Sequence, residues 1–248
     1  MLKRLLKPEA GGVSYTVRRS QRAKRTRIVV TADKIEVVAP PEVSERNIKA
    51  FVDAQQDWIR DAQKRVASRV RTVAGLAPEH YGDGAAIPYQ GRHLALALKP
   101  TRAKTVRVQI IDEGQLVIYL PAALADSSRS ERIRLALERW MKQQAKQHAL
   151  QMIDKHSARF ALQPRSLRIK TQKSRWGSCG ARNDINLNWL LMLAPPIVME
   201  YVVVHELCHI RHKNHSKDFW ALVAAHMPDY LQHRLWLKQH GASVMKGL

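Results

Sequence analysis

The first 120 residues alternate between hydrophobic and polar positions in short runs, which is the pattern of half-buried β-strands. The runs that predict strands lie at residues 13–18, 26–30, 34–38, 86–89, 94–98, 106–110 and 116–119. Between the third and fourth runs, Ser44 precedes hydrophobic residues at helical spacing that continue to about Val70, which predicts one helix. We therefore expect a mostly antiparallel β unit over residues 1–120, crossed by this helix.

Helical spacing dominates the rest of the chain. The predicted elements are a helix over about 130–160, strands over 167–171 and 184–189, a helix that begins at 195–196, and helices that begin at 217 and 230. We expect the longest helix to carry hydrophobic residues such as Leu137 and Leu150 on one side, and to link the β unit to the C-terminal domain. The sequence thus predicts an α+β protein with domains at residues 1–120 and 121–248.

The helix that begins at Pro195–Pro196 carries His205, Glu206 and His209 in the order H-E-x-x-H, inside a hydrophobic run. Residues i and i+4 lie on one face of an α-helix, about 6 Å apart, so the two imidazoles can bind a single metal ion. Glu206 lies beside them and can reach a water on that metal without being a ligand. Because buried polar groups are costly unless they are used, the spacing favours a zinc-hydrolase site over buried histidines satisfied by hydrogen bonds.

A catalytic zinc ion usually has three protein ligands and one open position, so a third ligand is needed. His212 would lie about 10 Å along the helix axis from His205, which is too far for a shared ion. His215 follows the expected helix end and can turn back towards the metal. Asp218 either holds a ligand ring or is a helix N-terminal charge, and the sequence favours neither. The predicted site is His205, His209 and His215 as ligands of one Zn²⁺ per chain, with Glu206 as the base.

The strand over 184–189 places its hydrophobic residues on one side and its asparagines on the other. A hairpin edge beside the metal helix could accept an extended peptide as an added strand; the alternative is that the asparagines form the solvated face of an ordinary hairpin. A tyrosine after the last turn could assist an oxyanion, or could simply pack. The candidate substrate contacts are Trp176, Gly177, Ser178, Asn186, Asn188 and Tyr230.

Basic residues outnumber acidic residues by 42 to 21, which gives a net charge of +21. The excess is concentrated: residues 1–30 carry nine basic groups and one acid, and residues 161–182 carry six basic groups and no acid. Basic surfaces attract polyanions, so DNA or another polyanion is a candidate partner. The alternative is that the charge serves solubility alone.

The sequence lacks the features typical of membrane and secreted proteins. No run of about 18 hydrophobic residues is present, so no membrane span is expected. The N-terminus has no long hydrophobic region of the kind found in signal peptides. Two cysteines, Cys179 and Cys208, do not make a disulfide framework, and Cys208 lies in the metal helix as a small hydrophobic residue. We therefore expect a cytoplasmic protein without membrane partners; the oligomeric state is not determined.

Several motifs together resemble a known family. They are K-S-R-W-G-S-C at 173–179, I-N-L-N-W at 185–189, Y-V-V-V-H-E-L-C-H at 201–209, N-H-S at 214–216 and F-W at 219–220, with further likeness at 18–25 and 39–41. This combination resembles the YgjP-like zinc metallopeptidases, which are related to the SprT-like and WLM peptidases. The resemblance spans nearly the whole chain. It implies a zincin-like C-terminal domain with three histidine ligands, and peptidase chemistry that in SprT-like proteins acts on DNA-bound protein.

Three functions are compatible with this sequence. The first is a zinc metallo-endopeptidase that cleaves peptide bonds through Glu206-assisted attack of zinc-bound water, with nucleic-acid-associated protein as a candidate substrate. The second is a metal-dependent nucleotide pyrophosphohydrolase or phosphohydrolase that uses the same site, although no Walker-type glycine loop is present. The third is a DNA-binding protein in which the zinc site is subsidiary.

Overall fold

The computed structural model describes residues 4–6, 13–31, 34–72, 74–112, 114–122, 124 and 126–248. The chain separates into two compact units, Met1–Ala74 and Gly75–Leu248, each with its own hydrophobic core. The expected division at residue 120 does not coincide with this boundary, because the second sheet shares one core with the long helix that comes after it. The α+β class is confirmed by the mixed helix and strand content.

The N-terminal unit is a four-stranded sheet with two helices. The sheet has the order β1 (Arg4–Leu6), β2 (Tyr15–Arg19), β4 (Ile35–Ala39), β3 (Arg27–Val30). The central pair β2 and β4 is parallel and the two outer pairs are antiparallel. Two helices, α1 (Glu45–Asp53) and α2 (Gln56–Thr72), take the place of the single predicted helix. Ser44 caps α1, since its hydroxyl accepts a hydrogen bond from the backbone N–H of Asn47 at 3.2 Å.

The C-terminal unit begins with a second four-stranded sheet, in the order β5 (Ala86–Tyr89), β6 (Arg92–Thr101), β8 (Gln115–Pro121), β7 (Arg107–Ile110). Its central pair, β6 and β8, is again parallel. The β5–β6 turn uses Gln90 and Gly91 with φ of 51° and 76°, the backbone that a two-residue hairpin requires. A Cβ on Gly91 would lie 2.8 Å from Pro195, so the glycine allows this turn to pack against the start of the helix that carries the H-E-x-x-H motif.

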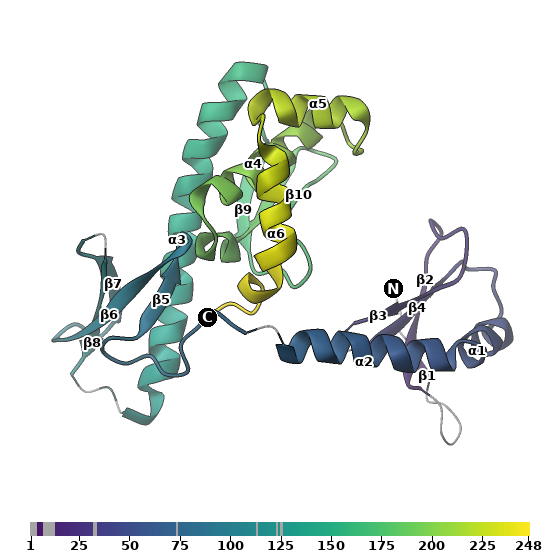
Figure 1. Cartoon of the computed structure of the whole chain (residues 1–248), viewed down its shortest axis with the longest axis horizontal. Helices are drawn as coiled ribbons and strands as arrows, with labels where there is room; N and C mark the ends of the chain where they lie inside the picture. Colours follow the sequence, from purple (N-terminus) through teal and green to yellow (C-terminus); the bar gives the residue numbers. More distant parts are fainter. Residues whose placement is uncertain are drawn as a thin grey trace. The chain divides into compact units, whose positions relative to one another are not determined.

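Helix α3 (Asp126–Phe160) carries a stripe of buried residues spaced every four positions. The stripe consists of Ile133, Leu137, Met141, Ala145, Ala149 and Ile153. Each step of four residues advances about 40° beyond a full turn, so the stripe winds by roughly 200° around the helix. Its first part packs towards the sheet of β5–β8 and its second part towards α4 (Figure 1). Leu150 lies off this winding stripe and is 42% exposed, so its predicted place on the buried side is wrong.

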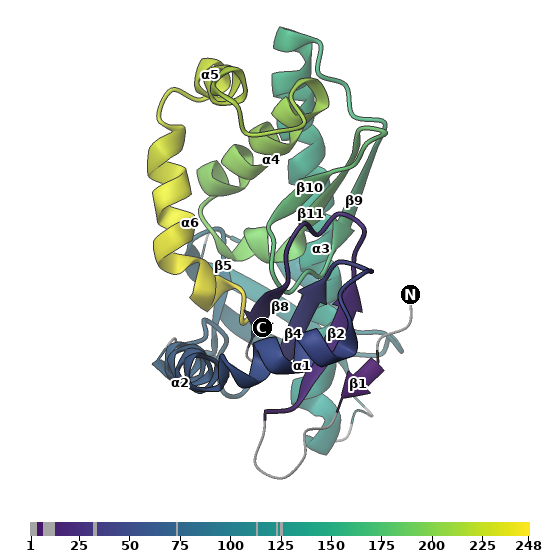
Figure 2. The same cartoon turned by 90° about the vertical axis from the view of Figure 1, so that its right-hand side faces the viewer.

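A small third sheet and three helices complete the unit. The sheet has the order β10 (Gly177–Cys179), β11 (Asp184–Asn188), β9 (Ser166–Lys170), with β10–β11 antiparallel and β11–β9 parallel. A short 3₁₀ helix, η1 (Trp189–Leu193), leads to α4 (Pro196–Arg211), α5 (Lys217–His226) and α6 (Tyr230–Val244). Helix α4 lies between α6 and β10 and is buried along most of its length (Figure 2).

Two simpler expectations can also be compared with the structure. Cys179 and Cys208 are both free thiols, and Cys208 is fully buried. Among the described residues, no helix combines the length and the apolar character needed to cross a membrane.

Candidate active site

Helix α4 carries three of the four side chains that the sequence predicts for the site. It begins after Pro195, and hydrophobic residues pack most of its other sides into the core. His205 and His209 are one helical turn apart, with ring centroids 4.9 Å from each other. Glu206 follows His205 and is 5% exposed. The local helix geometry therefore produces the pair of histidines and the adjacent carboxylate that the sequence predicted.

The third histidine comes from the turn between α4 and α5. The helix ends at Arg211, slightly earlier than expected, and the chain turns back so that His215 Nε2 lies 3.1 Å from His205 Nε2. Ser216 then begins α5, its hydroxyl accepting a hydrogen bond from the N–H of Phe219 at 3.3 Å. One nitrogen from each of the three histidines lies within 4.8 Å of the others. The structure thus brings together the three histidines predicted as ligands.

The donor set fits a metal ion. Burial, together with the neighbouring His209 and His215, lowers the pKa of His205 to about 3, so its imidazole is neutral, as metal binding requires. His209 Nδ1 lies 2.9 Å from the backbone oxygen of His212, a contact that fixes this ring and leaves its Nε2 for a metal. Two nitrogen ligands of a tetrahedral zinc ion lie roughly 3.4 Å apart, close to the observed separation of His205 and His215.

Phe219 supports all three histidines from one side. Its ring is fully buried, and its centroid lies 4.9 Å from His205, 4.5 Å from His209 and 4.8 Å from His215. Nδ1 of His205 is buried with no hydrogen-bond partner among the described residues, so packing rather than a hydrogen bond orients this ring. Asp218 is exposed, and within the described part of the chain no hydrogen bond or ion pair joins it to a histidine, which favours the interpretation of this residue as a helix N-terminal charge.

Glu206 is held against strand β10. Burial raises the pKa of its carboxyl group to about 7, although a hydrogen bond from the backbone N–H of Cys179 and the charge of Arg175 act in the opposite direction. A Cβ on Gly177 would lie only 2.6 Å from Oε1 of Glu206. The strand can therefore approach the carboxylate this closely only because residue 177 is glycine. A carboxyl group with a pKa near neutral pH is suited to accept a proton and to return it.

These groups open into a cleft of about 340 Å³. Its lining combines the three histidines and Glu206 with two cations, Arg175 and Lys213, and with residues 177–179 of β10. Both cations are exposed, and Nζ of Lys213 donates a hydrogen bond to Oδ1 of Asn183 at 2.7 Å. The cleft therefore joins three histidines that could hold a metal ion, a buried carboxyl group and a positively charged wall.

The six residues predicted to contact the substrate lie in different surroundings, and only some of them line the cleft. Gly177 and Ser178 line the cleft. Asn186 lies outside it and donates a hydrogen bond to the hydroxyl of Ser178 at 3.3 Å. Asn188 is completely buried, so its predicted place on the solvated face is wrong. Its amide nitrogen is 2.8 and 3.2 Å from the backbone oxygens of residues 172 and 175, which anchors the loop that carries Arg175.

The two aromatic candidates are packing residues in this structure. Trp176 is half-buried against α6, where a Cβ on Gly241 would lie 3.1 Å from its ring. Tyr230 stacks on Trp220, with centroids 5.4 Å apart, and Trp220 stacks on His215 at 5.6 Å. Tyr230 thus reaches the histidines only through another ring.

Sequence reasoning missed Arg175, Lys213 and Phe219. Arg175 and Phe219 lie inside motifs that carry the family resemblance, and Lys213 lies between two predicted ligands, but none of the three was given a role in the site. Only their contacts with the cleft or with the histidine rings distinguish them from ordinary surface or core residues.

This constellation belongs to the metal-dependent hydrolases. Residues 24–240 match the YgjP-like family, described as a metallopeptidase domain, and the chain is therefore a member of that family. The chain is also similar to a protein of Escherichia coli (strain K12) described as a UTP pyrophosphatase, with 36% identity over 67 residues. That similarity covers 25% of this chain and 40% of the relative's length.

Proposed function

We propose that this protein is a zinc metallo-endopeptidase. The observation that carries the proposal is the position of Glu206, which lies between the histidine triad and the edge strand of a sheet. Among the described residues strand β10 pairs with β11 alone, and its other edge faces Glu206 and the cleft. A peptidase of this kind must hold an extended chain beside its metal and its base, and an edge strand supplies main-chain hydrogen bonds for that purpose.

His205, His209 and His215 would hold the zinc ion. When bound, zinc acts as a Lewis acid and lowers the pKa of a water to about 7. Glu206 would take a proton from the attacking water and return it to the leaving amine, a role for which its raised pKa suits it. The N–H of Cys179 would hold the carboxylate in place during both transfers.

The edge of β10 would align the substrate. In its antiparallel pairing with β11, Ser178 lies opposite Asn186 and Cys179 opposite Ile185. The N–H of Cys179 is turned away from β11, because it donates to Glu206. An added peptide strand would therefore run along the same edge that positions the base, within hydrogen-bonding reach of the metal site.

A second candidate is hydrolysis of a phosphoanhydride. Two observations favour it: Arg175 and Lys213 give the cleft a positively charged wall, and a partial relative is described as a UTP pyrophosphatase. Cations next to the reacting group stabilise the developing charge in phosphoryl transfer. In this case Glu206 would activate the attacking water in the same way.

Product analysis of one mixture distinguishes the two candidates. The zinc-loaded protein is incubated with an unfolded protein and nucleoside triphosphates, with and without single-stranded DNA, and the products are identified by mass spectrometry. We expect new peptide termini with the wild type, and a fall of at least about a hundredfold in their rate with Glu206→Gln. Intact protein with hydrolysed nucleotide, absent with Glu206→Gln, would replace the peptidase proposal by the second candidate. Peptide cleavage that requires DNA would identify nucleic-acid-associated protein as the substrate.

A further inference from the structure

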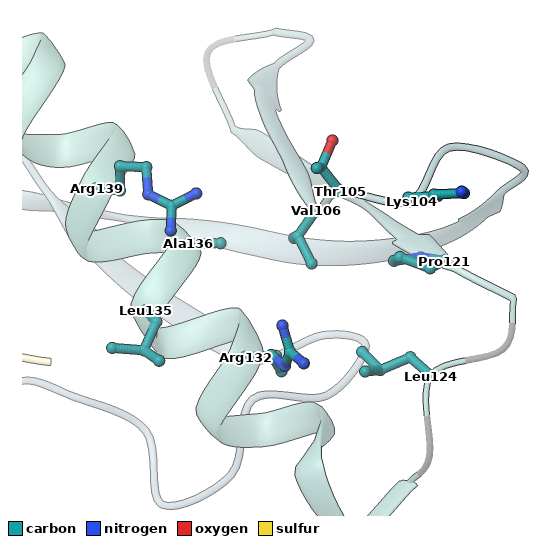
Figure 3. A pocket seen from close by; sticks show the side chains of 9 residues that line it. All are labelled: Lys104, Thr105, Val106, Pro121, Leu124, Arg132, Leu135, Ala136 and Arg139. Carbon is teal, nitrogen blue, oxygen red and sulfur yellow. The ribbon is translucent and has the colours of Figure 1, made fainter.

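A second and larger pocket lies between the first turns of α3 and the sheet of β5–β8. Its volume is about 490 Å³, within the range of small-molecule sites. Three basic residues, Lys104, Arg132 and Arg139, line it together with hydrophobic residues such as Val106 and Leu124 (Figure 3). Figure 3 shows Arg132 and Arg139 extending from the helix on the side that faces Val106.

The basic residues of this pocket differ from their neighbours on α3 in their pairing. Arg134 is paired with Glu131 at 2.7 Å, and Lys142 with Glu138 at 2.6 Å. These four residues follow one another at spacings of three and four, so their ion pairs form on another face of the helix. Within the described part of the chain, Lys104, Arg132 and Arg139 have no ion pair or hydrogen bond to a carboxylate.

The lining residues contain no acid, so the pocket concentrates positive charge. Arg132 and Arg139 are seven residues apart, which places them two turns apart on one face of α3. Lys104 comes from the loop between β6 and β7, on the opposite side of the pocket. Cations that line one pocket from two elements, with no carboxylate partner among the described residues, are suited to a ligand with several negative charges, such as a chain of phosphates.

The rest of the lining is hydrophobic. Pro121, Ala136 and Leu135 belong to it, and Leu135 is 44% exposed although it lies at the pocket. An inorganic anion would leave this surface uncovered, whereas an organic body attached to the phosphates would remove it from water.

We propose that this pocket binds a nucleotide-sized organic phosphate, with the phosphates between Lys104, Arg132 and Arg139 and the organic body against Leu135. The pocket shares no lining residue with the metal cleft. Along α3, Arg139 precedes His156 by 17 residues, or about 25 Å, and His156 contacts α4 through Glu200 at 2.7 Å. The site is therefore separate from the cleft, and the proposal does not depend on the reaction that the cleft performs.

Calorimetric titration of the full-length protein with a non-hydrolysable ATP analogue tests the proposal. We expect a site outside the metal cleft in the wild type, whether or not the cleft also binds the analogue, and the same affinity of that site in Glu206→Gln. The double variant Arg132→Gln/Arg139→Gln should lose at least about tenfold in affinity, because charge-assisted hydrogen bonds are removed. Leu135→Asp should weaken binding as well. The matched control is Lys146→Gln, which removes an exposed cation of the same helix outside the pocket and should leave the affinity unchanged.

No binding of the analogue by the wild type would overturn the proposal at once, and three further results would do so as well. The first is an unchanged affinity of the double variant. The second is an affinity for inorganic tripolyphosphate equal to that for the nucleotide analogue. Contacts between the organic body and the hydrophobic residues of the pocket would then contribute nothing to binding. The third is binding of single-stranded DNA that requires Arg132 and Arg139, with no binding of the mononucleotide. This result would assign the pocket to a nucleic-acid backbone instead.

Discussion

Gly177→Ala tests directly whether β10 positions Glu206. A Cβ at residue 177 would lie 2.6 Å from Oε1, 2.7 Å from Cγ and 2.9 Å from Cδ of Glu206. Since non-bonded carbon atoms settle at about 3.5–4.0 Å, the carboxyl group or the strand must move by about 1 Å. A misplacement of about 1 Å at a reacting group costs roughly a hundredfold in rate. We therefore expect kcat to fall about a hundredfold.

The same substitution should leave the metal site and the fold intact. The three nearest atoms to the new Cβ all belong to Glu206, and none belongs to a histidine. Overpacking by one methyl group costs about 1–3 kcal/mol, which a folded domain of this size tolerates. Metal content by atomic absorption and thermal unfolding by circular dichroism check both points.

The matched control is Gly180→Ala in the same hairpin. A Cβ there would meet its nearest atom, the backbone oxygen of Asp184, at 3.6 Å, which is ordinary van der Waals contact. We expect near wild-type kcat from this variant. A wild-type rate in Gly177→Ala would refute the steric argument. An equal loss in both variants would show that the hairpin as a whole, and not the contact with Glu206, governs activity.

Three further predictions concern residues behind the site. Phe219→Leu should weaken zinc binding by about 10- to 100-fold in a chelator competition assay, because the ring that packs on all three histidines is lost; unchanged affinity would show that the histidines hold their own positions. Asn188→Ala should lower the free energy of unfolding by about 1–3 kcal/mol in urea titrations, since two backbone carbonyls lose their buried donor; a loss within error would contradict the anchoring role. Burial, with His156 and two arginines, lowers the pKa of His226 to about 4, so the unfolded state binds more protons than the native state below the ordinary histidine pKa. The contribution of the neutral His226 to the free energy of unfolding is therefore complete above about pH 6.5 and is lost as the pH falls towards 4. When unfolding is measured at several pH values, the free energy of unfolding should depend less on pH in His226→Gln than in the wild type.

The failures of sequence reasoning have identifiable physical causes. Leu150 was expected on the buried side of α3, but a four-residue spacing winds around the helix and moves the buried face away from it. Asn188 was expected in solvent, but β11 ends at this residue, and the loop over residues 172–176 covers its amide and accepts its hydrogen bonds. The boundary at residue 120 was expected because strands give way to helices there, yet both share one core.

The sequence by itself determined the local part of the site. An i, i+4 spacing on a helix fixes two histidines and their neighbouring glutamate, and a third histidine just beyond the helix end needs only a short turn to reach them. The tertiary structure alone decided what surrounds them: β10 against Glu206, Phe219 beneath the histidine rings, and Arg175 held over the cleft by Asn188. Apart from Phe219, these arrangements join residues far apart in the chain, and all depend on close packing between elements. No local pattern specifies such packing, because it arises only when the helices and sheets bury one another.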